Sequence, residues 1–312
     1  MTWVVALGRR IGYLCSYIFA REYSFAVSQL RFTGVAGDVP PRDFARRVFA
    51  HVGEAIAEIL IQHRIMERHD ELFTYQGEDQ IREMLAAKGS AIALGAHLGC
   101  VELMATHFSR VKLDFAVVTR QPHSPAIAEL FESHRARFGI PTIWREKPRA
   151  GVELINALRS GKVVGALIDQ DIDLDNRFAS FFGLEAVSSV SLIKIALKYH
   201  LPIVSSFIVR TAPLHHQIIS ERIEYESLEG QLDDFQLIDH VLKIFNDRLE
   251  KLIVQYPDQW VWWHRRWRRR PGVDYRAHPE ALMSSSEYLV WIEGQRLQRR
   301  DRDMETTDSE EH

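Results

Sequence analysis

The sequence has little cysteine, no long hydrophobic run and almost no net charge, and each of these absences argues against a class of protein. The only cysteines, Cys15 and Cys100, lie far apart in a chain of 312 residues, so we expect no disulfide framework and a reducing compartment. The formal net charge of −3 provides no overall field for nucleic acid. Hydrophobic residues make up 46% and charged residues 26%, which is typical of a globular chain that fits one large domain.

No stretch reaches the roughly 18 uninterrupted apolar residues that a membrane-spanning helix needs. The nearest, residues 11–20, is bounded by charged residues on both sides. Residues 1–20 also lack the small-residue cleavage site of a secretory signal. Aromatic and apolar residues flanked by arginines predict that residues 1–40 form a segment lying along a membrane surface. A core helix at the edge of the domain fits the same pattern.

Strand and helix patterns alternate through the middle of the chain. Short apolar runs predict strands at 71–75, 91–94, 113–119, 140–144, 163–168, 202–209 and 217–220. Apolar residues at steps of three and four predict helices at 41–69, 78–88, from 101, and at 124–138, 152–158, 188–199 and 233–256. This alternation predicts an α/β fold with a mostly parallel central sheet covered by helices on both faces. The charged residues 298–312 should be disordered.

His97 falls between the strand pattern at 91–94 and the helix expected from residue 101. Ligands of open α/β sheets bind at the carboxyl ends of strands, where N–H groups that open the next helix can meet negative charge. Glu102 can face His97 only if His97 precedes the helix. A carboxylate in that position would fix the imidazole tautomer and leave the other nitrogen to take a proton from a hydroxyl. The alternative is a structural histidine beside a buried strand.

Cys100 lies three residues beyond His97 and raises the question of a cysteine nucleophile. A reactive thiol needs an accessible, electropositive environment. We expect Cys100 instead to pack as a small apolar residue in the first helical turn.

Four acidic residues alternate after the strand at 163–168, namely Asp169, Asp171, Asp173 and Asp175. A calcium loop of the EF-hand type needs glycine at its sixth and glutamate at its twelfth position. Leu174 and Ser180 occupy those positions when the loop is counted from Asp169. We therefore expect a solvated acidic loop, with no metal and no cofactor.

The segment from 260 to 270 interleaves aromatic and basic residues. It holds Trp260, Trp262, Trp263 and Trp267 among Arg265, Arg266, Arg268, Arg269 and Arg270. Such a segment could bind single-stranded nucleic acid by stacking and charge. It equally suits a membrane interface, where tryptophan lies at headgroup depth and arginine meets lipid phosphates. We favour the second interpretation because the chain has no other nucleic-acid motif, and we expect some of the tryptophans to be core residues.

Motifs in a fixed order resemble the bacterial late acyltransferases of lipid A synthesis, the lauroyl and myristoyl transferase family. The resemblance runs over about residues 90 to 272 and consists of Gly95-Ala-His97-Leu-Gly-Cys-Val-Glu102, Val118-Thr-Arg120 with Pro125 and Arg135, Asp169-Gln170-Asp171 followed by Phe181-Phe182-Gly183, and Pro257 to Trp267 with Arg270-Pro271. The set is far more specific than any single motif.

The resemblance implies acyl transfer from an acyl thioester, either acyl carrier protein or acyl-CoA, to a hydroxyl of a lipid A precursor or a similar membrane glycolipid. It makes His97 the general base and Glu102 the residue that holds its imidazole. The expected substrate-binding residues are Arg120, Arg135, Asp169, His264, Arg265 and Arg266. Arg135 is also the expected companion of Asp169 and, with N–H groups near Gly99, a candidate for oxyanion stabilisation.

The resemblance also implies an acyltransferase domain at 41–272, followed by a partly disordered extension at 273–312. It further implies that the protein is attached peripherally, or anchored shallowly, at the cytoplasmic face of the bacterial inner membrane. The arginines of the 260–270 segment could dock an acidic carrier protein. The family usually has an amino-terminal membrane anchor, and here it is shortened. The alternatives are a lysophospholipid acyltransferase, a membrane-peripheral lipid-binding protein without turnover, and a hydrolase that uses Cys100 or a serine.

Overall fold

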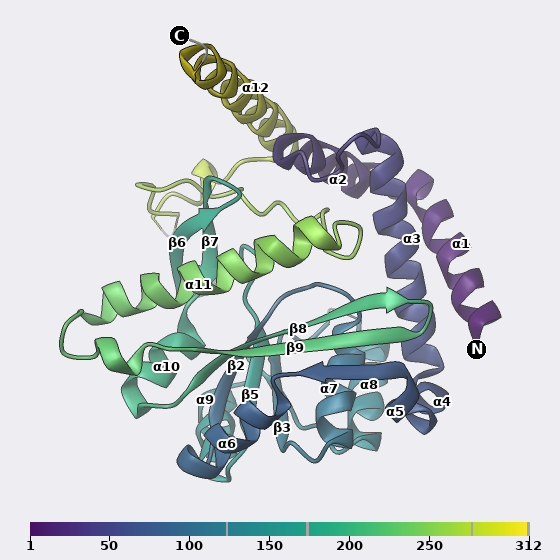
Figure 1. Cartoon of the computed structure of the whole chain (residues 1–312), viewed down its shortest axis with the longest axis vertical. Coiled ribbons are helices and arrows are strands. Elements are labelled where there is room, and N and C mark those ends of the chain that lie inside the picture. Colours follow the sequence, from purple (N-terminus) through teal and green to yellow (C-terminus); the bar gives the residue numbers. More distant parts are fainter. Residues whose placement is uncertain (123, 173–174, 276, 311–312) are drawn as a thin grey trace.

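A seven-stranded sheet forms the centre of the protein in a computed structural model that describes residues 1–122, 124–172, 175–275 and 277–310 (Figure 1). The strand order is β1-β9-β8-β2-β5-β3-β4. These strands are β1 (Phe73–Gln76), β2 (Ala91–Gly95), β3 (Phe115–Thr119), β4 (Thr142–Trp144), β5 (Val163–Leu167), β8 (Ile203–Ala212) and β9 (His215–Ile223). All neighbours are parallel except β8 and β9. The predicted mostly parallel sheet is confirmed.

Strand β2 is buried along its whole length because the sheet separates two hydrophobic cores. Ile92 and Leu94 point into one core, whereas Ala91 and Ala93 belong to the other. Successive side chains of a strand point to opposite faces, so a strand covered on both sides is apolar at every position.

Helices cover both faces, as predicted. They are α3 (Pro41–Leu60), α4 (Gln62–Glu67), α5 (His69–Leu72), α6 (Glu78–Lys88), α7 (Val101–Arg110), α8 (Pro125–Arg137), α9 (Ala150–Arg159), α10 (Ser191–Tyr199) and α11 (Asp234–Gln255), with single 3₁₀ turns at Glu226–Leu228 and Pro279–Ala281. Apolar residues of α6 and α7 belong to the core on one face, and those of α9, α10 and α11 to the core on the other. The single helix expected at 41–69 is wrong, because the chain bends at Ile61 and Arg68 into three helices.

A two-stranded antiparallel hairpin, β6 (Asn176–Phe181) and β7 (Leu184–Ser189), follows the loop after β5. Its two turn residues, Phe182 and Gly183, have φ of +51° and +76°. Two positive φ values give the turn a twist that matches that of the strands. The sequence predicted a helix from 188, but Ser188 and Ser189 end β7 and the helix begins at Ser191.

The chain begins with α1 (Thr2–Ile18) and α2 (Ala20–Thr33), and α1 runs alongside α3 (Figure 1). Gly8 and Gly12 face Gly53 of α3 so closely that a Cβ added to Gly12 would lie 2.9 Å from the Gly53 Cα. On its outer side α1 exposes Trp3, Leu7, Ile11, Leu14 and Ile18. Within the described part of the chain, none of the helices combines the length and the hydrophobicity needed to cross a bilayer.

The chain ends with α12 (Ser285–Glu310), which projects from the body of the protein (Figure 1). Its first turns are anchored, because Tyr288 and Ile292 are buried in the main core. The stretch from Gln298 to Glu310, for which the sequence predicted disorder, continues α12, and Arg299 donates a hydrogen bond to the Phe182 carbonyl oxygen at 3.2 Å. Residues 311–312, which the same prediction included, lie outside the described residues.

Candidate active site

His97 follows the carboxyl end of β2 and precedes α7, as the sequence predicted. The chain turns at Gly99, which has a φ of +66°. A Cβ at this position would lie 2.2 Å from the Ile208 carbonyl oxygen, so both the conformation and the space require glycine. The turn carries the chain from the sheet into α7 and leaves the His97 ring at the wall of a cavity.

Asp169 is the partner of His97. The His97 Nδ1 lies 2.8 Å from Asp169 Oδ1, and the His97 backbone N–H donates to Oδ2 at 2.9 Å. Trp260 Nε1 donates to the same Oδ2 at 2.8 Å. Burial alone would raise the pKa of Asp169, but the charge of His97 and these hydrogen bonds lower it to about 2. An ionised carboxylate only accepts, so Nδ1 carries the proton and Nε2 is the basic nitrogen.

Glu102 does not hold the imidazole, and this part of the sequence prediction is wrong. Its carboxylate accepts from Arg135 of α8, with Nε at 3.0 Å and Nη2 at 2.5 Å. Both side chains are largely buried, and both line the cavity. A bidentate pair of this kind satisfies both oxygens of Glu102. Arg135 is therefore the companion of Glu102 and not, as predicted, of Asp169.

A buried network holds the His97 loop from its other side. The Gly99 N–H donates to the Gln259 carbonyl oxygen at 2.9 Å, so among the N–H groups near Gly99 this one is already occupied. The Gln259 side chain bonds both backbone groups of Arg210, at 2.7 and 2.8 Å. Arg210 in turn donates to the fully buried Glu58 at 2.9 and 2.6 Å, and His216 Nε2 lies 3.3 Å from the same carboxylate. The loop is thus tied to the end of β8 and to α3.

The cavity beside His97 has a volume of about 940 Å³, and residues of both hydrophobic cores line it. Much of its lining is apolar, including Ala93, Met104, Phe108, Phe115, Leu167 and Leu192. Gly165 of β5 also lines it, and a Cβ there would lie 2.4 Å from the Phe115 ring. The cavity has the dimensions and the lining of a site for an apolar chain with a polar end.

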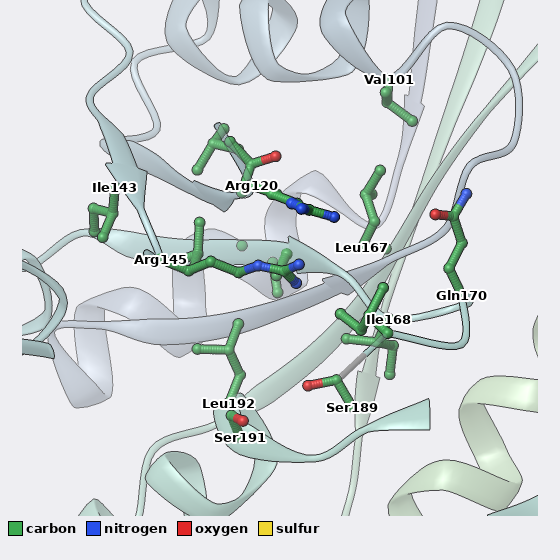
Figure 2. Close-up of a pocket in the computed structure, with 18 of the residues that line it drawn as sticks. Val101, Arg120, Ile143, Arg145, Leu167, Ile168, Gln170, Ser189, Ser191 and Leu192 are labelled. Atoms are coloured by element: carbon green, nitrogen blue, oxygen red, sulfur yellow. The ribbon is translucent and has the colours of Figure 1, made fainter. Parts of the chain in front are cut away.

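Two arginines point into the cavity next to Leu167, as Figure 2 shows. Arg120 follows β3 and Arg145 follows β4, and both approach Glu146, at 3.7 and 3.0 Å. The prediction placed Arg120 in the site but missed Arg145. The sequence did contain a signal for Arg145, namely its position directly after a predicted strand, which His97 and Arg120 share. Parallel strands bring the residues that follow them to one edge of the sheet.

The 260–270 segment is divided between the core and the surface. Trp260, Trp262 and Trp267 are fully buried, which confirms that some of the tryptophans are core residues. Arg266 is buried too: it bonds Ser188 Oγ at 2.7 Å and the Val187 carbonyl oxygen. Burial lowers the pKa of Arg266 to about 10. Arg266 thus holds β7 and, unlike the other arginines predicted for the site, lines neither the cavity nor the hollow that adjoins it.

His264 and Arg265 occupy different places relative to the cavity. His264 lines the cavity, and burial lowers its pKa to about 3, so the ring is neutral at physiological pH. Arg265 lies outside this cavity, where it donates to the Met283 carbonyl oxygen at 3.0 Å and covers the Phe25 ring. Arg268, which the sequence analysis named in the basic segment but not among the substrate-binding residues, lines the cavity.

The alternating acidic residues have separate partners. Asp171 lies 3.3 Å from Arg268 and 3.2 Å from Arg269, and Asp175 lies 2.6 Å from Lys194. Asp173 and Leu174 lie outside the described residues. Together with the burial of Asp169, these pairs replace the expected solvated loop by a set of structural ion pairs.

Cys100 packs as expected. Its thiol is buried and lies 3.7 Å from the Ala55 carbonyl oxygen. Burial raises the pKa of the thiol far above its usual range, so the thiolate that a nucleophile requires does not form near neutral pH.

The site therefore combines an imidazole–carboxylate pair with an apolar cavity at the carboxyl edge of a parallel sheet, which is an arrangement suited to acyl transfer. The sequence pattern of the family described as bacterial lipid A biosynthesis acyltransferase matches residues 2–269 of the chain. The chain belongs to this family, and it is an acyltransferase of lipid A biosynthesis. No individual curated protein matches it.

Proposed function

We propose that the protein moves a fatty acyl chain from an acyl thioester, acyl carrier protein or acyl-CoA, to a hydroxyl of a lipid A precursor. The observation that carries this proposal is the contact between His97 and the buried, ionised Asp169 at the wall of the apolar cavity. The reaction class is O-acyl transfer. It needs one base for the attacking hydroxyl and space for one long apolar chain.

In this mechanism the acceptor oxygen attacks the thioester carbonyl carbon while Nε2 of His97 takes the hydroxyl proton. Asp169 accepts from Nδ1 and stabilises the imidazolium that forms. The tetrahedral intermediate then collapses, the C–S bond breaks, and the thiolate takes the proton from Nε2. The ester forms directly, without an acyl-enzyme, which agrees with the burial of Cys100.

The apolar cavity supports a binding site for the acyl chain, with Phe115 over Gly165 near its inner end. Arg120 and Arg145 follow the second and third strands from β2. At a strand spacing of about 4.8 Å, they lie roughly 10 and 14 Å across the sheet from the end of β2. At that separation they bind a polar group of a substrate away from the reacting carbon.

The outer side of α1 supports peripheral attachment to the cytoplasmic face of the inner membrane. Trp3, Leu14 and Ile18 expose 70%, 60% and 74% of their surfaces on one side of the helix. Large exposed apolar patches on soluble folds mark surfaces that bind partners or membranes.

The test is acyl transfer by the purified full chain, with acyl carrier protein or CoA thioesters as donors and a lipid A precursor or a lysophospholipid as acceptor. Mass spectrometry detects one added acyl group. We expect transfer to the lipid A precursor, and loss of at least 10²-fold in kcat for His97→Ala. Near-normal turnover by this variant would overturn the base assignment. Transfer only to the lysophospholipid, or lipid binding without any transfer, would establish one of the two alternative functions.

A further inference from the structure

A second hollow, of about 240 Å³, adjoins the reaction cavity on the side of α2. It is lined by Arg21, Glu22, Phe25, Trp263, His264, Arg265, Arg268 and Ser285. His264 and Arg268 line both spaces. These two side chains thus form part of the wall of each space.

The second hollow is basic. Its lining contains three arginines and a single carboxylate, that of Glu22, although Arg268 is also paired with the buried Asp171 at 3.3 Å. Glu22 accepts from its neighbour Arg21 at 2.9 and 2.6 Å, but 71% of the Arg21 side chain is exposed. An exposed pair of this kind contributes little energy, so an incoming anion can compete for the guanidinium. The charge of Arg268, after the effect of burial, lowers the pKa of Arg265, which shows that positive charges face one another here.

Trp263 adds an aromatic wall. It is only partly buried, and it is held against Phe49 with ring centroids 4.9 Å apart. A fixed indole offers a large apolar surface at little cost in side-chain entropy. Guanidinium groups bind phosphate with paired donors. An aromatic wall beside three arginines fits a ring compound that carries a phosphate.

The hollow also lies beside the exposed apolar corner of the amino-terminal helices. Tyr17, Ile18 and Phe19 expose 60%, 74% and 50% of their surfaces where α1 ends, and Arg21 follows in the first turn of α2. A lipid whose chains contact this corner would bring its head group to the arginines.

We propose that this hollow binds the phosphorylated sugar head group of the acceptor, with the phosphate on Arg21, Arg265 and Arg268 and the sugar ring on Trp263. The acceptor hydroxyl then reaches His97 past His264 and Arg268. This inference rests on the proposed function, because it assigns the head-group site of the same reaction.

The kinetic test compares Arg21→Gln with Arg31→Gln, a control on the same helix whose side chain is exposed and does not line the hollow. For a phosphorylated glycolipid acceptor we expect Arg21→Gln to raise KM by about 3- to 10-fold with kcat unchanged, since one charge-assisted bond is lost in a solvent-exposed place. Glu22→Gln removes the competing carboxylate and should lower KM. The same glycolipid without phosphate should show neither effect. Equal increases in KM for both acceptors, or no increase, would overturn the proposal.

A binding test keeps this inference separate from the proposed function. Glucose 1-phosphate and glucose are titrated into the full-length His97→Ala variant, with and without Arg21→Gln, and binding is followed by ligand-observed NMR. We expect glucose 1-phosphate to bind more tightly than glucose and to lose this advantage in Arg21→Gln, even if no transfer is ever detected. If inorganic phosphate binds as tightly as glucose 1-phosphate, the sugar ring contributes nothing to binding and the proposed sugar site on Trp263 is overturned. If Arg21→Gln weakens binding only to vesicles of anionic phospholipid, the arginine contacts the bilayer and the proposal fails.

Discussion

Replacing Asp169 by asparagine tests the central contact of the site. The carboxylate accepts three hydrogen bonds, from the ring and the N–H of His97 and from Trp260. Asparagine offers one acceptor oxygen and one NH₂ group, so the NH₂ faces either the two donors that Oδ2 now accepts from or the ring. In the second case Nδ1 must accept, which leaves the proton on Nε2, the nitrogen that should act as the base. The imidazolium formed in the reaction also loses its counter-charge. Two charges about 4 Å apart at an effective dielectric of 20 interact by about 4 kcal/mol, so we expect kcat to fall by about 10²- to 10³-fold.

The assay is single-turnover acyl transfer followed by mass spectrometry across a range of pH. In Asp169→Asn the rate constant should fall at every pH, because the imidazolium that forms in the reaction has lost its negative neighbour. Glu102→Gln is the matched comparison, since its carboxylate lines the same cavity but pairs with Arg135. We expect it to lower stability by about 3–5 kcal/mol, as a buried arginine is left without its partner, and to lower the rate constant of the folded protein far less than Asp169→Asn does. If Glu102→Gln lowers the rate constant as much as Asp169→Asn, the assignment is refuted.

Three further predictions concern other parts of the protein. The contacts of Glu58 with His216 and Arg210 outweigh burial and lower its pKa from 4.5 to about 2, so this carboxylate stabilises the fold above pH 4.5 and loses that effect as the pH falls toward 2. In Glu58→Gln the free energy of unfolding should change less over this range, as measured by denaturant titration. Leu14→Asp with Ile18→Asp should reduce flotation with vesicles by about 10²-fold or more, since each apolar side chain contributes roughly 1.5–3 kcal/mol when buried. Gly165→Ala should shift preference to shorter acyl donors, by about fourfold per methylene excluded.

Each of these predictions has a control. Glu83→Gln alters an exposed carboxylate on α6 and should leave the acid dependence of stability unchanged. Leu130→Asp changes an exposed leucine on α8 and should not affect flotation. Gly294→Ala adds a Cβ where no atom lies within 4 Å and should not alter the preference among donors. A control that reproduces the effect of its matched variant contradicts the prediction concerned.

Much of the sheet and the position of the reactive histidine follow from local sequence. The apolar run of β2 and the glycine turn after it place His97 at a strand end, because periodicity and turn chemistry are properties of short segments. The partner of His97 is different. Asp169 and Glu102 both follow strand ends or open helices near the histidine, and only the tertiary arrangement decides that Arg135 neutralises Glu102 and leaves Asp169 for the imidazole.

The departures from the sequence predictions have physical causes. Arg266 reads as a surface arginine in a basic segment, yet the β6–β7 hairpin supplies buried acceptors for it, and the hairpin itself was not predicted. The helical residues after Gln298 have few apolar side chains, so composition argued for disorder. The contact between Arg266 and β7 joins segments about 80 residues apart in the sequence, and no local pattern records it.

The tie between Gln259 and the His97 turn links two stretches of chain that are translated far apart. Folding on the ribosome can complete the sheet strands that carry His97 and Asp169 before Gln259 and Trp260 leave the exit tunnel. Until they arrive, the turn lacks its backbone acceptor and the carboxylate lacks its indole donor. The active site of a nascent chain is therefore incomplete. It can act on acyl thioesters only after most of the polypeptide has been synthesised.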